Sequence, residues 1–366
     1  MWMAQLAHET RGGRPSASGQ GERRPATARD PWFDNVKVVA VVLVVCGHFL
    51  EPLQGKSDLL VAGHLWLYAF HVPAFVLVSG YFSRGFQPTT AKVRGLVERL
   101  VLPYVAFEVL YALFRRVVED EPIRLTLAEP WWLTWFLLCL VIWRFTAPVW
   151  GVLRYPVLTS VVISCAAGLT PLPDELESGR LLQMLPFFVL GTRVQQRHLD
   201  LLRRPVARIC GALFLAASLA VAIVITPEVS SRWTLMTTDY EGLGVGPVEG
   251  VLLHLLQLAV EVLLVASFLA VVPRSSVGVS GLAIGTMYAY LLHGFLVRGA
   301  MAGGFFDLPF VATGAGVALL TVATAAVALL LMSGPVRTAF RPLVEPQVAW
   351  FFRRPGVESP AQPRSD

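Results

Sequence analysis

The chain repeats apolar segments that are long enough to cross a lipid bilayer. A helical crossing needs about 20 mainly apolar residues, and the chain holds ten candidates: 33–53, 60–82, 97–114, 131–150, 155–172, 181–196, 208–226, 250–272, 280–301 and 310–333. Among its 366 residues 55% are hydrophobic and 15% are charged, whereas a soluble domain carries about a quarter charged residues. The sequence therefore predicts an all-α, polytopic membrane bundle of about ten transmembrane helices.

The distribution of lysine and arginine predicts the orientation of this bundle. If the N-terminus is inside, most of the 30 Lys and Arg residues fall on the cytoplasmic side, as the positive-inside rule requires. The predicted outer loops are acidic instead, for example at Asp174, Glu175 and Glu177. Both termini are therefore expected in the cytoplasm. The excess positive charge then faces anionic lipid, so a nucleic-acid partner is not needed to explain it.

Three regions follow from composition. Residues 1–32 are polar and rich in Gly, Pro, Ser and Arg, without the apolar core of a signal peptide, which predicts a disordered basic tail. Residues 33–335 form the predicted transmembrane domain, and residues 336–366 a cytoplasmic C-terminal tail. The four cysteines lie in apolar segments and form no CxxC pair, so neither a metal site nor a disulfide framework is expected.

The first apolar segment carries its polar groups on one face. Steps of three and four residues place six side chains on a single helical stripe: Asp34, Lys37, Val41, Val44, His48 and Glu51. A rise of about 1.5 Å per residue separates the lysine and the histidine by roughly 16 Å along the axis. An ionisable group at membrane depth must face the bundle interior or water. The stripe therefore predicts a polar site inside the bundle rather than a snorkelling lysine and a packed core histidine.

The second segment adds two more histidines. His64 lies near its outer end and His71 near mid-membrane, and Pro73 is expected to break the helix. The run "SGYF" closes the segment at the inner face, where Ser79 and Gly80 allow close backbone approach to another helix.

Several sequence blocks, in this order, resemble the acyltransferase family 3 integral membrane proteins, and among them the fucose 4-O-acetylase-like branch. The two specific blocks are "WFDNVKVVAVVLVVCGHF" and "FHVPAFVLVSGYFSRG". The blocks "RLVLPY", "WFLLCLVIWR", "LPFFVLGTRV" and "YAYLLHGFLV" follow them in order and add weaker individual matches. The resemblance covers essentially all of residues 32–335. It implies about ten helices and transfer of an acyl group, usually acetyl, from acyl-CoA to a hydroxyl of a sugar or other glycan.

The resemblance also implies roles for individual residues, with two departures from the family pattern. The family places a basic residue, usually Arg, ten intervening residues before an essential histidine, and these positions are Lys37 and His48. Lysine offers a single point charge, whereas arginine can make two parallel hydrogen bonds to one phosphate group. A second basic pair of the form RxxR is common before the "LPY" block; Arg99 matches it, but position 96 is Leu, and Arg94 lies further upstream. Lys37, Arg94 and Arg99 are thus the expected ligands of the CoA phosphates.

The expected chemistry centres on His48. An imidazole can accept a hydroxyl proton near neutral pH, and Glu51, one turn on, can orient the ring. We expect the acceptor hydroxyl to attack the thioester directly, with a transient acyl-histidine as the less favoured route. His71 is expected either to assist this reaction or to hydrogen-bond the backbone freed near Pro73.

Three further residues are assigned to the substrate side. Ser79 lies in the "SGYF" run, and Tyr290 and His293 lie in "YAYLLHGF", where a structural use is the alternative. No metal is expected, so the predicted partners are acyl-CoA, a hydroxylated acceptor (a sugar, a glycan or a natural product) and the lipid bilayer.

Two other functions fit parts of the pattern. Intramembrane histidines and carboxylates, including Glu108 and Glu261, are what a proton-coupled transporter would show, although no internal repeat is visible. A non-catalytic scaffold is the other alternative, but it would give the buried ionisable groups no function.

The high content of Ala, Val, Arg and Gly points to a bacterial source, and hence to the plasma membrane.

Overall fold

The computed structural model describes residues 30–226, 229–230 and 232–346, together with residues 348, 350 and 352. This part of the chain is built from helices and contains no strand. The α-helices are α2 (Pro31–Leu50), α3 (Asp58–Tyr68), α4 (His71–Phe82), α5 (Thr90–Leu96), α6 (Leu102–Val118), α7 (Trp135–Val152), α8 (Pro156–Ala167), α9 (Ser178–Gln183), α10 (Leu185–Arg193), α11 (Gln196–Leu202), α12 (Pro205–Ile225), α13 (Arg232–Leu235), α14 (Pro247–Val271), α15 (Thr286–Ala302), α16 (Gly314–Leu331) and α17 (Gly334–Val344).

Short 3₁₀ and π turns connect several of these helices. The 3₁₀ turns are η1 (Glu51–Lys56), η3 (Trp132–Thr134), η4 (Glu175–Glu177), η5 (Ser280–Gly285), η6 (Phe305–Asp307) and η7 (Pro309–Ala312). A single π turn, η2 (Val97–Val101), joins α5 to α6. The all-α prediction is therefore confirmed.

Seven helical segments among the described residues are long and apolar enough to cross a membrane: Pro31–Lys56, Asp58–Phe82, Trp132–Val152, Pro205–Ile225, Pro247–Val271, Ser280–Ala302 and Gly314–Leu331. Of the three remaining predicted segments, 155–172 contains the short apolar helix α8, 97–114 falls in η2 and α6, and 181–196 falls in α9 and α10. The count of ten and the side of each terminus stay predictions.

Helices α12 and α14 expose rows of Val, Leu and Ile, the surface expected of helices against lipid. The protein is a multi-pass integral membrane protein.

The domain limits predicted from composition differ from the ends of the helices by a few residues. Helix α2 begins at Pro31, two residues inside the predicted basic tail, and residues 1–29 lie outside the described residues. Asp30 caps this helix by accepting a hydrogen bond from the backbone N–H of Trp32 at 3.0 Å. At the other end, α17 (Gly334–Val344) crosses the predicted limit, and its residues 336–344 lie in the region expected to be a C-terminal tail.

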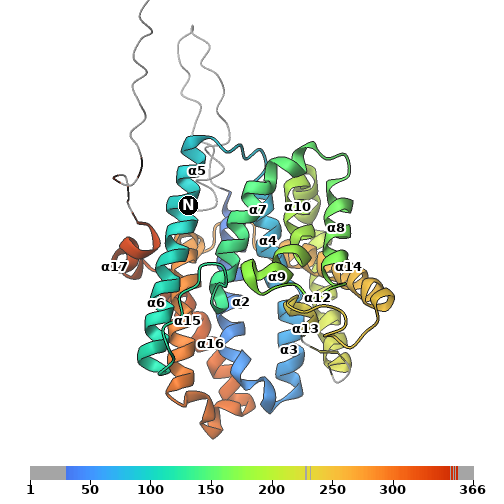
Figure 1. Cartoon of the computed structure of the whole chain (residues 1–366). Coiled ribbons are helices and arrows are strands. Elements are labelled where there is room, and N and C mark those ends of the chain that lie inside the picture. The colour runs from blue at the N-terminus through green and yellow to red at the C-terminus, as the bar shows by residue number, and fades with distance from the viewer. Residues whose placement is uncertain are drawn as a thin grey trace, which may run out of the picture.

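Helix α2 runs through the middle of the bundle (Figure 1). It packs against α15 and α16 on one side and against α3 and α4 on the other, so its residues are covered all round. In the same view α6, α15 and α16 lie together, and α12 and α14 pair on the opposite side. The central position of α2 explains why most of its side chains, charged ones included, are buried.

The second predicted segment is broken where the sequence suggests. Helix α3 ends at Tyr68 and α4 starts at His71, which places Pro73 in the first turn of α4, where a missing N–H is tolerated. The break frees the carbonyl of Leu67, which accepts hydrogen bonds from the Phe70 N–H at 3.2 Å and from His71 Nδ1 at 2.7 Å. The proline therefore divides the segment into two half-length helices and fixes the direction of His71.

Helices α4 and α10 approach each other through glycine. A Cβ atom on Gly80 would lie 2.0 Å from the carbonyl oxygen of Phe188, and a Cβ on Gly191 would lie 2.0 Å from that of Leu77. Only residues without a side chain allow this backbone contact, as at small-residue helix crossings in membranes. The close approach expected at the "SGYF" run is present in the structure.

This contact gives a test of the fold. Gly191→Ala should lower the free energy of unfolding by about 1–3 kcal/mol, because the added methyl group forces the two backbones apart. Thermal unfolding of the purified protein in detergent measures the change. Gly63→Ala is the matched control: no atom lies within 4 Å of a Cβ at this position in α3, so alanine should stabilise the helix by about 0.5–1 kcal/mol. Equal behaviour of the two variants would contradict the packing described.

Candidate functional site

A cavity of about 170 Å³ lies inside the bundle, where α2 meets the breaks between the other helices. Its walls are mainly apolar and aromatic, with a small number of polar groups. They are formed by Val41, Val44, His48, Glu51, Tyr68, His71, Val72, Phe75, Trp132, Leu133, Trp135, Phe136, Leu137, Arg180, Met184, Thr234, Leu235, Thr286, Met287 and Tyr290. An apolar pocket with a few convergent polar groups is the usual form of a small-molecule site.

The polar stripe predicted on α2 forms one wall of this cavity. Val41, Val44, His48 and Glu51 all line it, at the spacing that places them on one helical face. Lys37, at the other end of the stripe, is buried and forms an ion pair with Asp34, with Nζ and Oδ1 2.9 Å apart. The stripe thus joins a buried ion pair to a histidine that faces the cavity.

His48 is held from one side of its ring. Its Nδ1 lies 3.1 Å from Oε2 of Glu51 and 3.4 Å from the hydroxyl of Tyr68. Its ring also packs edge-on against Trp132, with ring centres 4.9 Å apart, and lies 5.3 Å from the ring of His293. Both polar contacts that the structure gives are made by Nδ1, which leaves Nε2 for a bound molecule. A neutral ring that donates Nδ1–H to Glu51 carries its free lone pair on Nε2.

His71 and His293 both bind backbone carbonyls. Nδ1 of His71 lies 2.7 Å from the oxygen of Leu67, and Nδ1 of His293 lies 2.9 Å from that of Ala289. The backbone bond considered for His71 is therefore present, and the residue also lines the cavity. His293 is fully buried beside His48 but is not among the lining residues. In the neutral form each ring keeps Nε2 as an acceptor, so neither is suited to donate a hydrogen bond from that atom.

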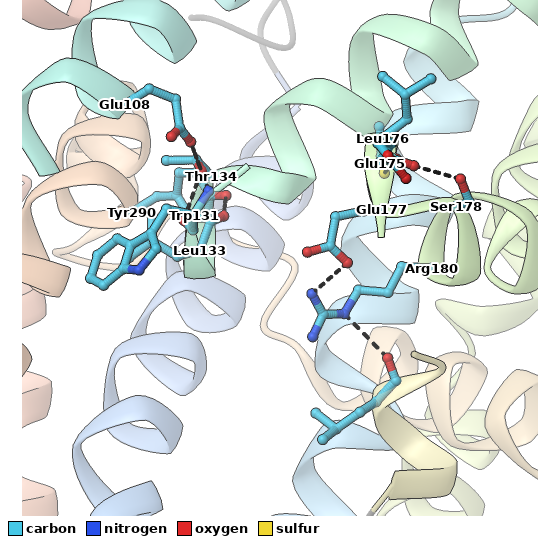
Figure 2. Close-up of polar contacts among 12 residues, drawn as sticks. Glu108, Trp131, Leu133, Thr134, Glu175, Leu176, Glu177, Ser178, Arg180 and Tyr290 are labelled. Carbon is cyan, nitrogen blue, oxygen red and sulfur yellow. Dashed lines mark hydrogen bonds and ion pairs between the residues drawn. The ribbon is translucent and has the colours of Figure 1, made fainter. Parts of the chain in front are cut away.

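Tyr290 belongs to a polar cluster that fixes the loop before α7 (Figure 2). Its hydroxyl donates to the carbonyl of Leu133, while a carboxylate oxygen of Glu108 accepts from the Trp131 N–H at 2.9 Å and from the Thr134 hydroxyl. This arrangement gives Glu108 a structural role, because it satisfies the donors of Trp131, which precedes η3, and of Thr134 within it. The cluster positions the adjacent Trp132, which packs on His48.

Arg180 separates the cavity from a second, more polar one of about 180 Å³. It lines both, and the second cavity is also bordered by Glu129, Asp174, Glu177, Ser178 and Thr237. Figure 2 shows Arg180 and Glu177 pointing toward each other; Nη1 lies 2.9 Å from Oε2, and Nε donates to the carbonyl of Leu235 at 3.2 Å. Burial raises the pKa of Glu177, although the Arg180 charge acts in the opposite direction.

The other residues assigned from the sequence lie apart from the cavity. Ser79 is buried in α4 near the contact with α10 and does not line the cavity. Arg94 forms an ion pair with Glu98 at 3.0 Å, and Arg99 lies in the π turn η2. The structure therefore brings together His48, Glu51, His71 and Tyr290, but it does not place the three predicted phosphate ligands on this cavity.

Sequence reasoning missed several residues of the site. Tyr68 and Trp132 contact the His48 ring, and Arg180 closes one side of the cavity. Arg180 follows an acidic run in a predicted outer loop, where an arginine is expected to be exposed to water. Its position in the sequence has no helical spacing that connects it to His48. Among the described residues, no cluster of three or more His, Cys, Asp or Glu side chains could hold a metal ion.

The support of this site by Glu108 can be tested. Glu108→Ala should reduce the free energy of unfolding by about 1–3 kcal/mol, because it leaves the Trp131 N–H and the Thr134 hydroxyl without their acceptor. Thermal unfolding in detergent gives the value. Glu241→Ala, at an exposed turn, removes the same charge and should change stability by no more than about 0.5 kcal/mol. A loss no larger than in this control would show that the cluster does not hold the loop.

Comparison with known proteins places the chain in a family. The model of the Acyl_transf_3 family, described as an acyltransferase domain, matches residues 30–333. The nodulation protein NolL of Mesorhizobium japonicum is 35% identical over 97 residues, which cover 25% of this chain and 26% of that protein. The NolL protein of Sinorhizobium fredii is 34% identical over 83 residues, or 21% of this chain and 22% of that protein.

These matches with curated relatives span about a quarter of the relatives' length. No solved structure matches the chain significantly. Placement in the fucose 4-O-acetylase-like branch stays a prediction. The family match, in contrast, covers helices α2 to α16 and includes every residue of the cavity described above. The chain therefore belongs to the acyltransferase family 3 membrane proteins.

Proposed function

We propose that the protein is an O-acyltransferase that moves an acyl group, acetyl by preference, from cytoplasmic acyl-CoA to a hydroxyl of a sugar, glycan or other small acceptor. The observation that carries this proposal is the position of His48, whose ring faces an apolar cavity inside the bundle while Glu51 contacts its Nδ1 at 3.1 Å. Membership of an acyltransferase family favours this activity over proton-coupled transport.

In this proposal His48 is the general base. The acceptor hydroxyl gives its proton to Nε2 as its oxygen attacks the thioester carbonyl carbon, and Glu51 stabilises the imidazolium that forms. The C–S bond then breaks, the imidazolium returns the proton to the CoA sulfur, and the acyl ester leaves. Direct transfer needs the acceptor and the thioester in the cavity together. Attack by Nε2 itself, through an acyl-histidine, is the second route.

Donors for the developing oxyanion are available on the cavity wall. Arg180 uses Nε and Nη1 in its two hydrogen bonds with protein groups, so Nη2 is left for a ligand. The Tyr68 hydroxyl also lines the cavity. Preorganised donors of this kind supply much of the rate enhancement in acyl transfer. We assign this role to Arg180 or Tyr68 rather than to His71, because Nδ1 of His71 is bound to the Leu67 carbonyl.

The two adjoining cavities suit the two substrates. The mainly apolar cavity around His48 fits an acyl group and the flexible arm of CoA, which would enter from the cytoplasmic side. The polar cavity beyond Arg180, bordered by Glu129, Asp174 and Glu177, offers acceptors for the hydroxyl groups of a sugar. Lys37, Arg94 and Arg99 remain our candidates for the CoA phosphates, with cytoplasmic termini and a bacterial plasma membrane as the setting.

Replacement of His48 tests the base. Purified protein is incubated with radiolabelled acetyl-CoA and a panel of methyl glycosides and other small alcohols. His48→Ala should lower transfer by about 10²–10⁴-fold, because the general base is lost. His198→Ala, which changes an exposed histidine in α11, should transfer label at the parent rate. Equal transfer by the parent and His48→Ala would exclude His48 from the mechanism.

Replacement of Glu51 tests the orientation of the base. Glu51→Gln should reduce kcat about 10–100-fold, because the charge-assisted hydrogen bond to Nδ1 and the stabilisation of the imidazolium are lost. The KM for acetyl-CoA should change little, since Glu51 does not bind the donor in this proposal. Initial rates at varied acetyl-CoA separate the two constants. A raised KM with unchanged kcat would assign Glu51 to donor binding instead.

A further inference from the structure

Arg144 is a charged side chain buried inside the bundle without a counter-ion. It lies on α7 and is 1% exposed, and its Nε and Nη2 atoms have no hydrogen-bond partner. Among the described residues no carboxylate forms an ion pair with it. A buried, uncompensated charge costs several kcal/mol, and in a membrane protein such a group is by default part of a functional site. Packing alone gives no reason to place an arginine here.

A second arginine lies on the turn that packs against α7. Arg99 is in the π turn η2, this turn packs against α7, and the charge of Arg99 acts on Arg144. A π turn rotates the following residues relative to a regular helix, and single π turns are frequent at functional sites. Two guanidinium charges that act on each other repel. An anion bound near both would be attracted to both and would offset this repulsion.

The position of Arg144 relates it to the cavity. Leu137, Leu140 and Arg144 follow steps of three and four residues on α7 and share one face, and Leu137 lines the cavity that contains His48. At about 1.5 Å of rise per residue, Arg144 stands roughly 10 Å along the helix axis from Leu137. An anion held by Arg144 would therefore lie beyond the apolar part of the cavity, on the same side of α7.

We propose that Arg144, together with Arg99, binds a phosphate group of the acyl donor. A guanidinium presents paired N–H donors that match phosphate oxygens, and it keeps its charge in an apolar environment better than lysine. The donor's phosphates would then be anchored at Arg144 while its arm extends along α7 toward His48. The identity of the ligand as an acyl donor rests on the proposed function. The buried cation of Arg144 predicts an anion site whether or not that function is correct.

Binding of CoA and of pantetheine, which has the same arm without phosphates, tests the proposal. Isothermal titration of the full-length protein in detergent should give tighter binding of CoA than of pantetheine. Arg144→Met should weaken CoA binding roughly 10–100-fold, the value of hydrogen bonds to a charged group, and leave pantetheine binding unchanged. Arg144→Lys should restore part of the CoA affinity. Arg154→Met, which removes an exposed charge just after α7, should bind CoA like the parent.

The thermal stability of Arg144→Met shows whether Arg144 serves to bind a ligand or to stabilise the fold. Without ligand, Arg144→Met should have a Tm equal to or above that of the parent, because an apolar side chain replaces an uncompensated charge. A lower Tm together with weaker binding of both CoA and pantetheine would overturn the proposal in favour of a packing role. If Arg144→Met does not fold, Arg144→Lys keeps the charge and should still show weaker CoA binding, and unchanged CoA affinity in this variant would overturn the proposal.

Inorganic pyrophosphate distinguishes the failure of this inference from the failure of the proposed function. If the parent binds CoA and Arg144→Met binds it equally well, Arg144 is not a phosphate ligand, and acyl-CoA remains the proposed donor. If the parent does not bind CoA, the proposed donor is wrong. Pyrophosphate binding by the parent and not by Arg144→Met would in that case still support an anion site.

Discussion

The burial of ionisable groups in a bundle that faces hydrocarbon is the constraint on which the rest of this structure depends. Lipid offers no hydrogen bonds, so each such group needs a partner within the protein. Lys37 and Asp34 form an ion pair at 2.9 Å, and Glu108 accepts from Trp131 and Thr134. His48 and Arg144 differ from these groups. His48 keeps one ring nitrogen for a ligand, and two nitrogens of Arg144 have no partner.

Breaks in the helices make a site of this kind possible. A continuous helix uses its own backbone groups, whereas the ends of half-length helices leave donors and acceptors that can hold side chains. The α3–α4 break directs His71 through the Leu67 carbonyl, and the turn before α7 places Trp132 against His48. The π turn η2 places Arg99 beside α7. The cavity lies where these irregular segments surround α2, so the chain combines a continuous central helix with interrupted neighbours around this cavity.

Local spacing made much of α2 and α4 predictable. A period of 3.6 residues places Val41, Val44, His48 and Glu51 on one face whatever the rest of the chain does, and the structure lines the cavity with that face. The break near Pro73 and the close approach at Gly80 were predictable for the same reason, since proline lacks an N–H and glycine lacks a side chain. Ser79 shows the limit of this reasoning, because proximity in sequence to a tight helix contact does not place a residue on the cavity.

Amino-acid composition and local periodicity thus determined that this chain forms membrane helices and that α2 carries a polar stripe. Both properties follow from transfer of side chains to hydrocarbon and from helical geometry, which need no information about distant residues. The tertiary structure alone decided that Tyr68, Trp132 and Arg180 meet that stripe at the cavity. It also decided that η2, which carries Arg99, packs against α7, which carries Arg144. These residues are far apart in the chain, and their meeting depends on how helices cross and where they are interrupted. No spacing rule within a single segment contains that information.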